Sequence, residues 1–428
     1  MSSLWKNTIN LKQFDRLEGD KKTDVLIIGG GICGILTAYS LKKAGVSCIL
    51  VEADRVCGGT SANTTAKITA QHGVIYKKIT DKYGPGAAKL YYKANSEAIE
   101  KYRALGADIE YKDAYVYSKH DLSILEEEYR AALKAGAKAR FMTHTPLPFG
   151  TVGAIRFLNQ AQCNPLSIAS KLINDLDIYE NTRITELAPH TAKHEKGMIH
   201  ADKIIVATHF PILNKHGAFF LKLYQHRSYV LALENAQDVN GMFVDANTNG
   251  YSFRNYGRFL LLGGGSHKTG KKGGGIDELR DFAKKYYPDA IERYAWAAQD
   301  CMSLDGIPYI GRYSDKVDGL YVATGFNKWG MSSSMVASQI LTDMVLGKKN
   351  EYEELYSPSR GMLCTRLFAN CAGSVLNLIT PTVPRCPHLG CALKYNRAEK
   401  SWDCPCHGSR FHENGALIEG PATKGLKS

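Results

Sequence analysis

Apolar runs and an amphipathic stretch alternate near the start of the chain. Residues 24–28 are rich in Val, Ile and Leu, a mixed stretch follows as far as Lys43, and a second apolar run ends at Glu52. Apolar runs of about four to eight residues are typical of buried strands, and the stretch between them has the period of a helix. The pattern therefore predicts a strand, a helix and a second strand, the order that produces parallel pairing.

The rest of the chain alternates in the same way but less regularly. Helices are predicted at 87–105, 122–135 and 164–176 and from about Ser333, and strands at 111–118, 201–208, 224–234, 251–265 and 320–324. The sequence GGGSHKTGKKGGG at 263–275 predicts a flexible segment. Because strand–helix–strand character returns only in separate pieces, the chain is predicted to be an α/β protein with a second lobe inserted into it.

Three glycines follow the first predicted strand at GxGxxG spacing. Gly29 allows a tight turn, Gly31 lets a pyrophosphate approach the backbone, and Gly34 lets the helix pack close to the strand. Glu52 ends the second strand, where a carboxylate can accept hydrogen bonds from an adenosine ribose. The competing interpretation is a glycine-rich turn in an ordinary α/β core. The flanking strand, helix and acid favour a dinucleotide site.

Composition limits the classes of partner. The 428 residues have a formal charge of +12, of which residues 361–428 contribute eight Lys or Arg against four Asp or Glu. There is no basic tail or arm, so nucleic-acid binding is not expected. The excess of positive charge is interpreted as a solvated basic surface or as a docking site for an acidic electron-carrier protein.

Neither a membrane span nor export is expected. The most apolar stretch, 368–383, is interrupted by Asn370, Asn377 and Pro381. The first residues, MSSLWKNTINLKQF, contain no apolar core followed by a cleavage site. A cytoplasmic location is the resulting expectation, and the oligomeric state is left open.

Four of the eleven cysteines lie within 21 residues near the C-terminus, beside two histidines. Cys386 and His388 form CxH, fifteen residues follow, and Cys404 and His407 form CxxH. Two thiolates and two imidazoles could bind zinc, but structural zinc sites usually pair like ligands in each loop. One Cys and one His in each loop is what a Rieske [2Fe-2S] centre requires, with both Cys on one iron and both His on the other. Zinc remains the alternative.

The order of three segments resembles the D-amino acid and glycine oxidase (DAO) family of flavoproteins. These are the GxGxxG fingerprint, ADKIIVAT at 201–208, and DGIPYIG followed by LYVATGFNKWGM between 305 and 331. The resemblance covers about residues 20–350. It implies FAD, a discontinuous Rossmann-like FAD-binding domain (about 20–85, 150–215 and 295–355), and an antiparallel-sheet substrate domain (about 86–149 and 216–294).

The same resemblance assigns cofactor-binding residues by position. Gly29, Gly31, Gly34 and Glu52 match the ADP-binding residues of the family. Arg55, Thr60, Ser61 and Thr65 match the stretch along the pyrophosphate and ribityl chain, and Gly325, Phe326, Gly330 and Met331 match the loop and helix start near the flavin ring.

Residues 361–428 resemble Rieske domains, which are small and all-β. The resemblance implies that Cys391 and Cys406 form a disulfide and that the Ser409 hydroxyl bonds a cluster sulfur. Phe411 stands where the family has a tyrosine that donates to a cysteine sulfur. Only 25 residues separate Arg360 from Cys386, so the domain is either minimal and supported by the flavin domain, or incomplete and unable to hold its cluster.

Together the two resemblances imply an FAD-dependent oxidoreductase that oxidises an amine or amino acid and passes electrons through the cluster to an external acceptor. The alternatives are an oxygen-using oxidase with a non-functional cluster remnant and a non-enzymatic electron-transfer or redox-sensing protein. Lys67, Arg254 and His267 are the candidate catalytic residues, and each has a purely structural alternative. The flavin and the cluster lie on separate parts of the chain and are therefore expected to be retained independently.

Overall fold

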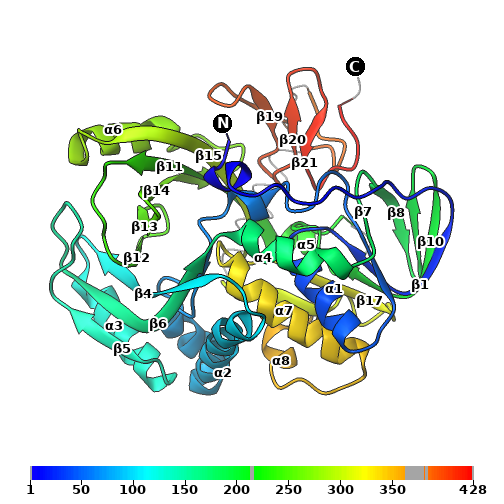
Figure 1. Cartoon of the computed structure of the whole chain (residues 1–428), viewed down its shortest axis with the longest axis horizontal. Helices are drawn as coiled ribbons and strands as arrows, with labels where there is room; N and C mark the ends of the chain where they lie inside the picture. Colours follow the sequence, from blue (N-terminus) through cyan, green and yellow to red (C-terminus); the bar gives the residue numbers. More distant parts are fainter. Residues whose placement is uncertain (1, 213–215, 362–379, 381–383, 427–428) are drawn as a thin grey trace.

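The structure is a computed structural model, and it describes residues 2–212, 216–361, 380 and 384–426. Two large sheets stand side by side with helices packed against them, and a small third sheet lies across the top (Figure 1). The short entry to the C-terminal domain that the sequence predicts falls mostly on residues 362–379 and 381–383, which lie outside the described residues. No helix in the described ranges is long and apolar enough to cross a membrane.

The first sheet has the order β16-β17-β10-β1-β2-β7. β1 (Lys21–Ile28) pairs in parallel with β2 (Cys48–Val51) and with β10 (Gly197–Val206), and β10 pairs in parallel with β17 (Leu320–Thr324). The last residues of β1 and β10 and nearly all of β2 and β17 are apolar and buried, as expected for parallel strands covered by helices. The strands come from distant parts of the chain, which confirms the discontinuous Rossmann-like domain.

Several helices and short strands complete this half of the molecule. α1 (Ile32–Lys43) packs against α7 (Gly330–Val345), which begins three residues before the predicted start. α2 (Tyr76–Ala104) is two helices joined at Gly84, whose φ of +84° breaks the helical path; only the second helix was predicted. The remaining elements are η1 (Leu4–Asn7), η2 (Thr60–Asn63), α4 (Pro165–Leu172), η3 (Ile173–Asp175), β7 (Ile178–Tyr179), β8 (Ile184–Ala188), β9 (Thr191–His194), α5 (Phe219–Lys222), β16 (Tyr309–Arg312) and α8 (Glu353–Tyr356).

The second sheet has nine strands in the order β15-β11-β14-β13-β12-β4-β6-β3, with β5 beside β6. All pairs are antiparallel except β4 with β12. The strands are β3 (Lys67–Ile68), β4 (Ile109–Ser118), β5 (Ala139–Met142), β6 (Gly153–Cys163), β11 (Leu223–Glu234), β12 (Met242–Asp245), β13 (Ser252–Tyr256), β14 (Phe259–Lys268) and β15 (Ile291–Ser303), and α3 (Leu122–Lys134) and α6 (Ile276–Tyr286) lie beside them. β6 and most of β15 fall in segments predicted for the FAD-binding domain.

Strand β14 departs from the sequence prediction. The predicted strand ended at Gly265, but β14 continues through the segment predicted to be flexible, where His267 and Lys268 pair with Arg227 and His226 of β11. The glycines fit because side chains from β13 and its approach occupy the space above them: an added Cβ would lie 2.6 Å from Ser252 Oγ at Gly263 and 2.6 Å from Tyr251 at Gly264. Glycine here makes room for neighbours rather than for motion.

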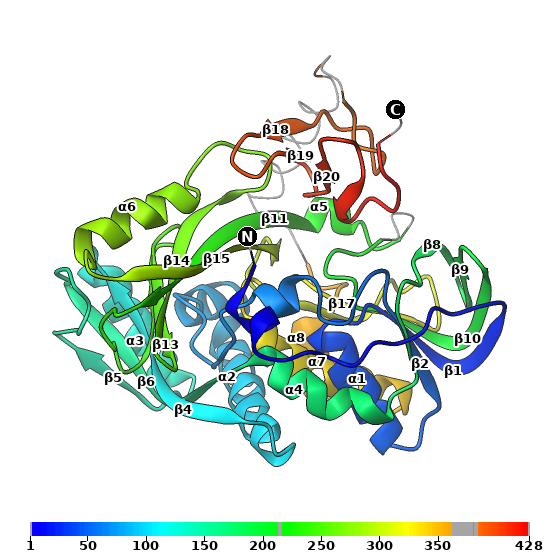
Figure 2. The same cartoon turned by 45° about the horizontal axis from the view of Figure 1, so that its top comes forward.

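The C-terminal domain is a four-stranded antiparallel sheet of β18 (Lys394–Asn396), β19 (Ser401–Asp403), β20 (Arg410–His412) and β21 (Leu417–Glu419). It sits above β11 and β15, between the two large sheets (Figure 2). Its small core contains four cysteines together with Leu393, Phe411 and Ala422. This confirms the small all-β domain.

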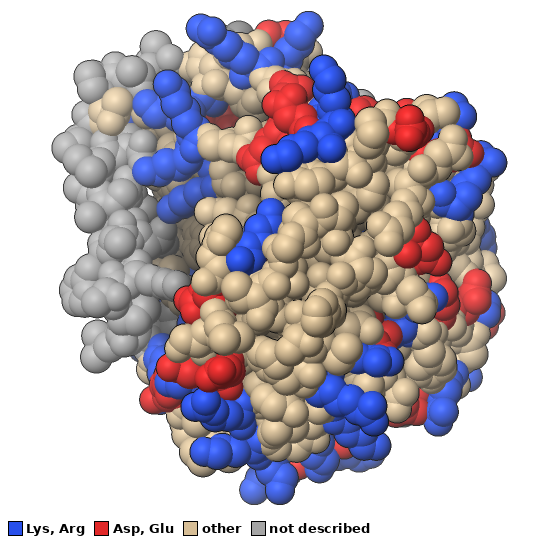
Figure 3. All heavy atoms as spheres, turned by 90° about the vertical axis from the view of Figure 1, so that its left-hand side faces the viewer, with Lys and Arg blue, Asp and Glu red and all other residues tan. Residues whose placement is uncertain are grey.

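The exposed charges of this domain are mostly positive. In the described part, Arg385, Lys394, Arg397, Lys400 and Lys424 are exposed, whereas Glu413 is the one exposed carboxylate. Lys and Arg gather at the top of the molecule, with a smaller acidic group among them (Figure 3).

Candidate functional site

A cavity of about 1060 Å³ opens where β1, β10 and β17 end. Gly29 and Gly31 line it after β1, Thr208 after β10, and Gly325 after β17. This is the crevice beyond the carboxyl ends of parallel strands, where ligands bind in open α/β sheets. We call it the cofactor cavity.

The three fingerprint glycines fit a bound dinucleotide. Gly29 has φ +114° and a Cβ there would lie 2.4 Å from the carbonyl oxygen of Ala207, so no larger residue fits. A Cβ at Gly34 would lie 2.0 Å from the Gly29 carbonyl oxygen, which shows how closely α1 packs on the turn. Gly31 precedes α1 and lines the cavity, so a pyrophosphate can reach the backbone N–H groups at the start of that helix.

Glu52 lies at the far side of the same turn. Its two carboxylate oxygens accept hydrogen bonds from the backbone N–H groups of Gly30 (2.7 Å) and Asp54 (2.9 Å), and the side chain lines the cavity. Burial raises the pKa of this carboxyl, an effect that the two backbone hydrogen bonds oppose. Donors from a ribose would further stabilise the charged form, so the position suits the role predicted for it.

The other predicted cofactor residues line the cavities. Arg55, Thr60, Ser61, Gly325, Phe326, Gly330 and Met331 line the cofactor cavity, whereas Thr65 lines a second, adjacent one. Ser61 Oγ accepts a hydrogen bond from Ile32 N–H (3.1 Å), and Thr60 Oγ1 donates to the Gln299 carbonyl (3.1 Å). The segment predicted to follow the cofactor therefore does lie beside the cavity.

The second cavity, of about 330 Å³, shares part of its wall with the first. The shared residues are Thr64, Asp300, Lys328, Gly330 and Met331. It lies beside the nine-stranded sheet and is also lined by Lys67, Tyr251 and Trp329. We call it the substrate cavity because it adjoins the cofactor cavity and is lined by both apolar and polar side chains.

Of the three candidate catalytic residues, the structure brings only Lys67 to a cavity. Lys67 Nζ donates to Thr65 Oγ1 (3.2 Å), and burial lowers the pKa of this lysine to about 7, with Arg254 contributing. Arg254 is completely buried and donates to the carbonyls of Thr65, Ala66 and Cys163. It lines neither cavity, so its guanidinium organises the backbone beneath Lys67.

His267 also lies away from both cavities. Its ring stacks on Tyr229, with centroids 5.8 Å apart, and its Nδ1 contacts the Gly265 carbonyl (3.4 Å). The sequence placed Arg254 and His267 on the sheet beside the flavin, but strand position alone did not say which face each side chain occupies.

Sequence reasoning missed Lys328 and Asp300, which line both cavities. Burial lowers the pKa of Lys328 and raises that of Asp300, and the attraction between the two charges opposes both shifts. Lys328 lies in the GFNKWGM motif next to Phe326, so that motif was the available signal. Asp300 is the one acidic residue in the apolar-rich end of β15, which is a weaker sequence signal.

The loop that carries Lys328 is held in an uncommon conformation. Asn327 and Lys328 have φ of +53° and +73°, a region that residues other than glycine rarely adopt. The Asn327 side chain accepts from Ser303 N–H (2.9 Å) and donates to Ser303 Oγ (3.0 Å) and the Gly325 carbonyl (2.5 Å). Strain retained by such a bonding set is typical of functional loops.

The four predicted cluster ligands come together in like pairs. The thiols of Cys386 and Cys404 are in contact, and this contact, against burial, lowers the pKa of Cys386 to about 7. The rings of His388 and His407 lie 5.0 Å apart at 83°. Nδ1 of His407 is buried and makes no hydrogen bond among the described residues, so it is available as a ligand atom. Two thiols beside two imidazoles fit a [2Fe-2S] cluster.

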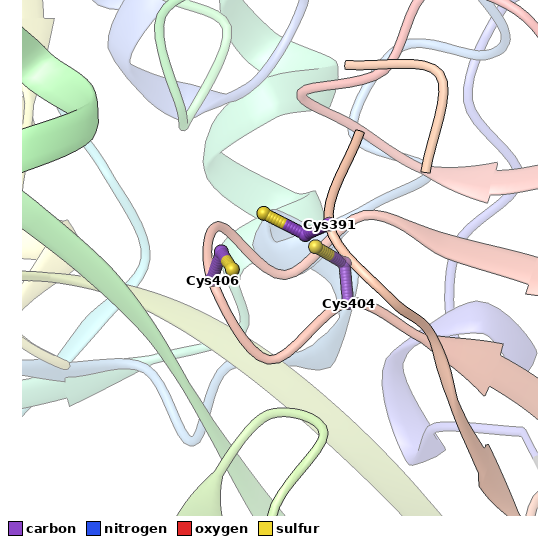
Figure 4. A group of neighbouring side chains, drawn as sticks. All are labelled: Cys391, Cys404 and Cys406. Carbon is purple, nitrogen blue, oxygen red and sulfur yellow. The ribbon is translucent and has the colours of Figure 1, made fainter. Parts of the chain in front are cut away.

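Cys391 and Cys406, the other two cysteines of the C-terminal cluster, lie beside these ligands. The Sγ atoms of Cys391, Cys404 and Cys406 all lie within 4.8 Å of one another, and Figure 4 shows them converging from two loops. The predicted disulfide is not present, because Cys391 and Cys406 are both free thiols. The structure shows the proximity that such a bond requires, and the bond itself stays a prediction.

Ser409 and Phe411 lie where the resemblance places them. The Ser409 hydroxyl contacts Cys386 and accepts a hydrogen bond from Ala422 N–H (3.0 Å). Phe411 is completely buried in β20 beside the ligand loops. It offers no hydroxyl to a cluster sulfur.

The two sites are in contact through Phe210, although they lie on separate parts of the chain. Phe210 lines the cofactor cavity, and its ring centroid lies 6.3 Å from that of His388 and 5.8 Å from that of His407. Gln299 Nε2 donates to the Gly408 carbonyl (2.9 Å) in the second ligand loop, while the Gln299 carbonyl accepts from Thr60. The imidazole side of the cluster site therefore faces the cofactor cavity.

A Rossmann-like cofactor cavity, an adjoining substrate cavity and a Cys2His2 cluster site define a flavoprotein oxidoreductase with an iron–sulfur domain. Residues 24–344 match the family described as FAD dependent oxidoreductase (DAO), and residues 379–428 match the Rieske [2Fe-2S] domain. The chain belongs to the DAO family of FAD dependent oxidoreductases, and its cofactors are FAD and a [2Fe-2S] cluster.

Two relatives show how far the similarity extends. YhfW of Bacillus subtilis (strain 168), named for a Rieske 2Fe-2S iron-sulfur centre, is 34% identical over 493 aligned positions, covering 99% of this chain and 96% of its own. Cytochrome b6-f complex iron-sulfur subunit 1 of Synechocystis is 47% identical over 45 residues, 10% of this chain and 25% of its own. The first similarity includes both domains.

Two solved structures resemble the flavin portion. Glycine oxidase from Geobacillus kaustophilus aligns with a TM-score of 0.67 at 19% identity, covering 80% of this chain and all of its own. L-proline dehydrogenase from P. horikoshii aligns with a TM-score of 0.66 at 17% identity, covering 80% of this chain and 98% of its own. At these identities the likeness establishes the fold.

Proposed function

We propose that the protein oxidises a small amine or amino acid at FAD and passes the electrons through the [2Fe-2S] cluster to an external one-electron acceptor. FAD supplies a two-electron hydride acceptor and the cluster a one-electron carrier. Glycine oxidase and L-proline dehydrogenase, the proteins with the same fold, are named for amino acid substrates, which supports this substrate class.

Residues of the substrate cavity suit an amine. Because its pKa is about 7, Lys67 can be neutral and accept a proton from the substrate ammonium group. The resulting neutral amine loses hydride more readily. Lys328 and Asp300 offer opposite charges to a zwitterion. Trp329 provides an apolar wall and is stacked on His72, with ring centroids 4.7 Å apart.

The contact of Phe210 with both imidazole ligands is the observation that carries the proposal. An aromatic ring that lines the cofactor cavity and contacts both cluster histidines supports a short path between the two redox groups. Short separation favours electron transfer between them. A plain oxygen-using oxidase would have no need of this arrangement.

The test is anaerobic titration of the purified protein with a panel of amino acids and secondary amines. We expect an active substrate to bleach the flavin absorbance and to generate the electron spin resonance of the reduced cluster in the same sample. Flavin reduction with the cluster left oxidised, together with oxygen consumption, would instead establish an oxygen-using oxidase. No flavin reduction by any amine would favour a redox-sensing protein.

A further inference from the structure

Part of the cofactor cavity belongs to the C-terminal domain. Besides residues of the Rossmann-like domain, the cavity is lined by the segment that includes β21, here called the wall segment (Leu417–Thr423); its lining residues are Leu417, Ile418, Glu419, Gly420, Ala422 and Thr423. These residues lie almost 400 positions after the fingerprint glycines. A chain without its C-terminal domain would have a cofactor cavity open on this side.

A buried network of charges holds the domain in this position. Glu399 pairs with Arg227 of β11, in contact at two atoms, and with Arg410 of β20 (2.9 Å). It also accepts from the Tyr229 hydroxyl (2.8 Å), and Tyr229 lines the substrate cavity. The side chains of Glu399, Arg227 and Arg410 are at most 9% exposed, so each charge depends on the others for compensation.

The wall segment is also bonded to the cluster site. Ala422 N–H donates to Ser409 Oγ, and that hydroxyl contacts the Cys386 thiol. Glu419 lies 3.7 Å from both Arg227 and Arg410. One short segment therefore touches the cofactor cavity, the cluster ligands and the charge network that joins the domains.

We propose that the wall segment is part of the FAD-binding site, so that FAD binding and docking of the iron–sulfur domain stabilise each other. A cofactor that touches both domains binds the docked arrangement better than the separated one. By linkage, docking must then tighten FAD binding by the same factor by which FAD favours docking. The inference rests on the assignment of the cofactor cavity to FAD and does not depend on which substrate or acceptor the protein uses.

The first test breaks the network without touching a cavity. Glu399→Gln keeps the side-chain shape but removes the carboxylate that lies closest to Arg227. Arg227 then keeps Glu419 at 3.7 Å, and Arg410 keeps Asp403 (3.0 Å) and Glu419 (3.7 Å). We expect the holoprotein to release FAD about tenfold faster on dilution, as measured by the rise in free-flavin fluorescence, an effect within the range typical of coupled sites. Glu413→Gln is the matched control, since Glu413 is exposed and bonds only to Tyr395 of its own domain in the described structure; its release rate should equal that of the wild type.

A second variant changes the wall itself. Ile418→Ala shortens a side chain that lines the cavity and leaves the charge network intact. We expect faster FAD release with unchanged iron content. If Glu399→Gln loses its iron as well as its FAD, this variant still separates a wall effect from misfolding.

The reciprocal test uses limited proteolysis. Protein from which FAD has been removed should lose its C-terminal domain to protease faster than protein with FAD bound. Adding FAD back should restore protection. The proposal would be overturned if both Glu399→Gln and Ile418→Ala released FAD at the wild-type rate. It would also be overturned if the rate of proteolysis were the same with and without FAD. Because no substrate or acceptor is present, either result leaves the proposed reaction to its own test.

Discussion

At the scale of single residues, Gly31 has the most direct consequence for the cofactor. It precedes α1 with an ordinary φ of −75°, so its role is space and not backbone conformation. A Cβ there would already lie 3.1 Å from Ser61 Oγ. Gly31→Val should therefore fold but exclude the pyrophosphate, giving protein without flavin absorbance.

The control for this variant is Gly150→Val. Gly150 has no neighbour within 4 Å of an added Cβ and is exposed. It should retain FAD at the wild-type ratio. Full flavin occupancy in Gly31→Val would contradict the fingerprint assignment.

Lys67 makes a prediction about pH. Its pKa is about 7 in the folded protein and about 10.5 when unfolded, so between these values the unfolded chain binds more protons and stability rises with pH. Below about pH 7 both states are charged and the full cost of burial remains. Lys67→Met should thus raise the free energy of unfolding most at and below about pH 7, with the gain shrinking toward pH 10, as measured by denaturant titration.

The same substitution should impair turnover. If neutral Lys67 accepts the substrate proton, kcat/KM rises through about pH 7 in the wild type, and Lys67→Met should be at least about tenfold slower without that limb. Lys134→Met, on the exposed side of α3, should keep the wild-type profile. If kcat/KM of Lys67→Met still rises through about pH 7, that rise reflects the titration of another group.

At the scale of elements, the two ligand loops are held by their own backbone bonds. Cys386 N–H donates to the Cys391 carbonyl (2.9 Å), and Cys404 N–H to the Ser409 carbonyl (2.8 Å). Such loops can present ligands even though the domain sheet is small. These bonds favour the first of the two possibilities left open by the sequence, a minimal domain supported by the flavin domain, which stays a prediction.

Removing a ligand tests the identity of the metal. His388→Ala and Cys404→Ala should each abolish the electron spin resonance of the reduced cluster and reduce the iron content from two atoms per chain toward zero. FAD content is measured in parallel. One zinc and no iron in the wild type would establish a structural zinc site.

At the scale of the whole molecule, the described part of the C-terminal domain has six Lys or Arg against four Asp or Glu, and this balance understates its positive surface charge. Its acids Glu399 and Asp403 are consumed in buried pairs with Arg227 and Arg410, whereas its exposed charges are nearly all positive. An acidic one-electron carrier should therefore associate faster at low ionic strength. Stopped-flow reduction of an acidic one-electron carrier protein whose reduction potential lies above that of the cluster should slow by about tenfold or more between 20 and 500 mM salt.

A neutral acceptor is the control for the salt effect. Its reduction should change little over the same range, because screening acts on charge attraction alone. The double variant Lys394→Glu, Arg397→Glu should remove most of the salt dependence for the acidic carrier. A salt dependence that survives this variant would place docking elsewhere.

The sequence by itself determined the features that depend on neighbours along the chain. The glycine turn with Glu52 and the CxH and CxxH loops need only a few adjacent residues in a set conformation, so their spacing was sufficient to identify them. The order of the flavin segments could likewise be predicted from the sequence, since buried parallel strands have continuous apolar runs.

Only the tertiary structure decided which distant residues share a space. Asp300 and Lys328 meet at the wall between the cavities, Phe210 meets the cluster histidines, and the wall segment closes the cofactor cavity. It also turned Arg254 onto backbone carbonyls, away from both cavities. Each outcome depends on the packing of segments tens to hundreds of residues apart, and such packing has no local pattern in a single sequence.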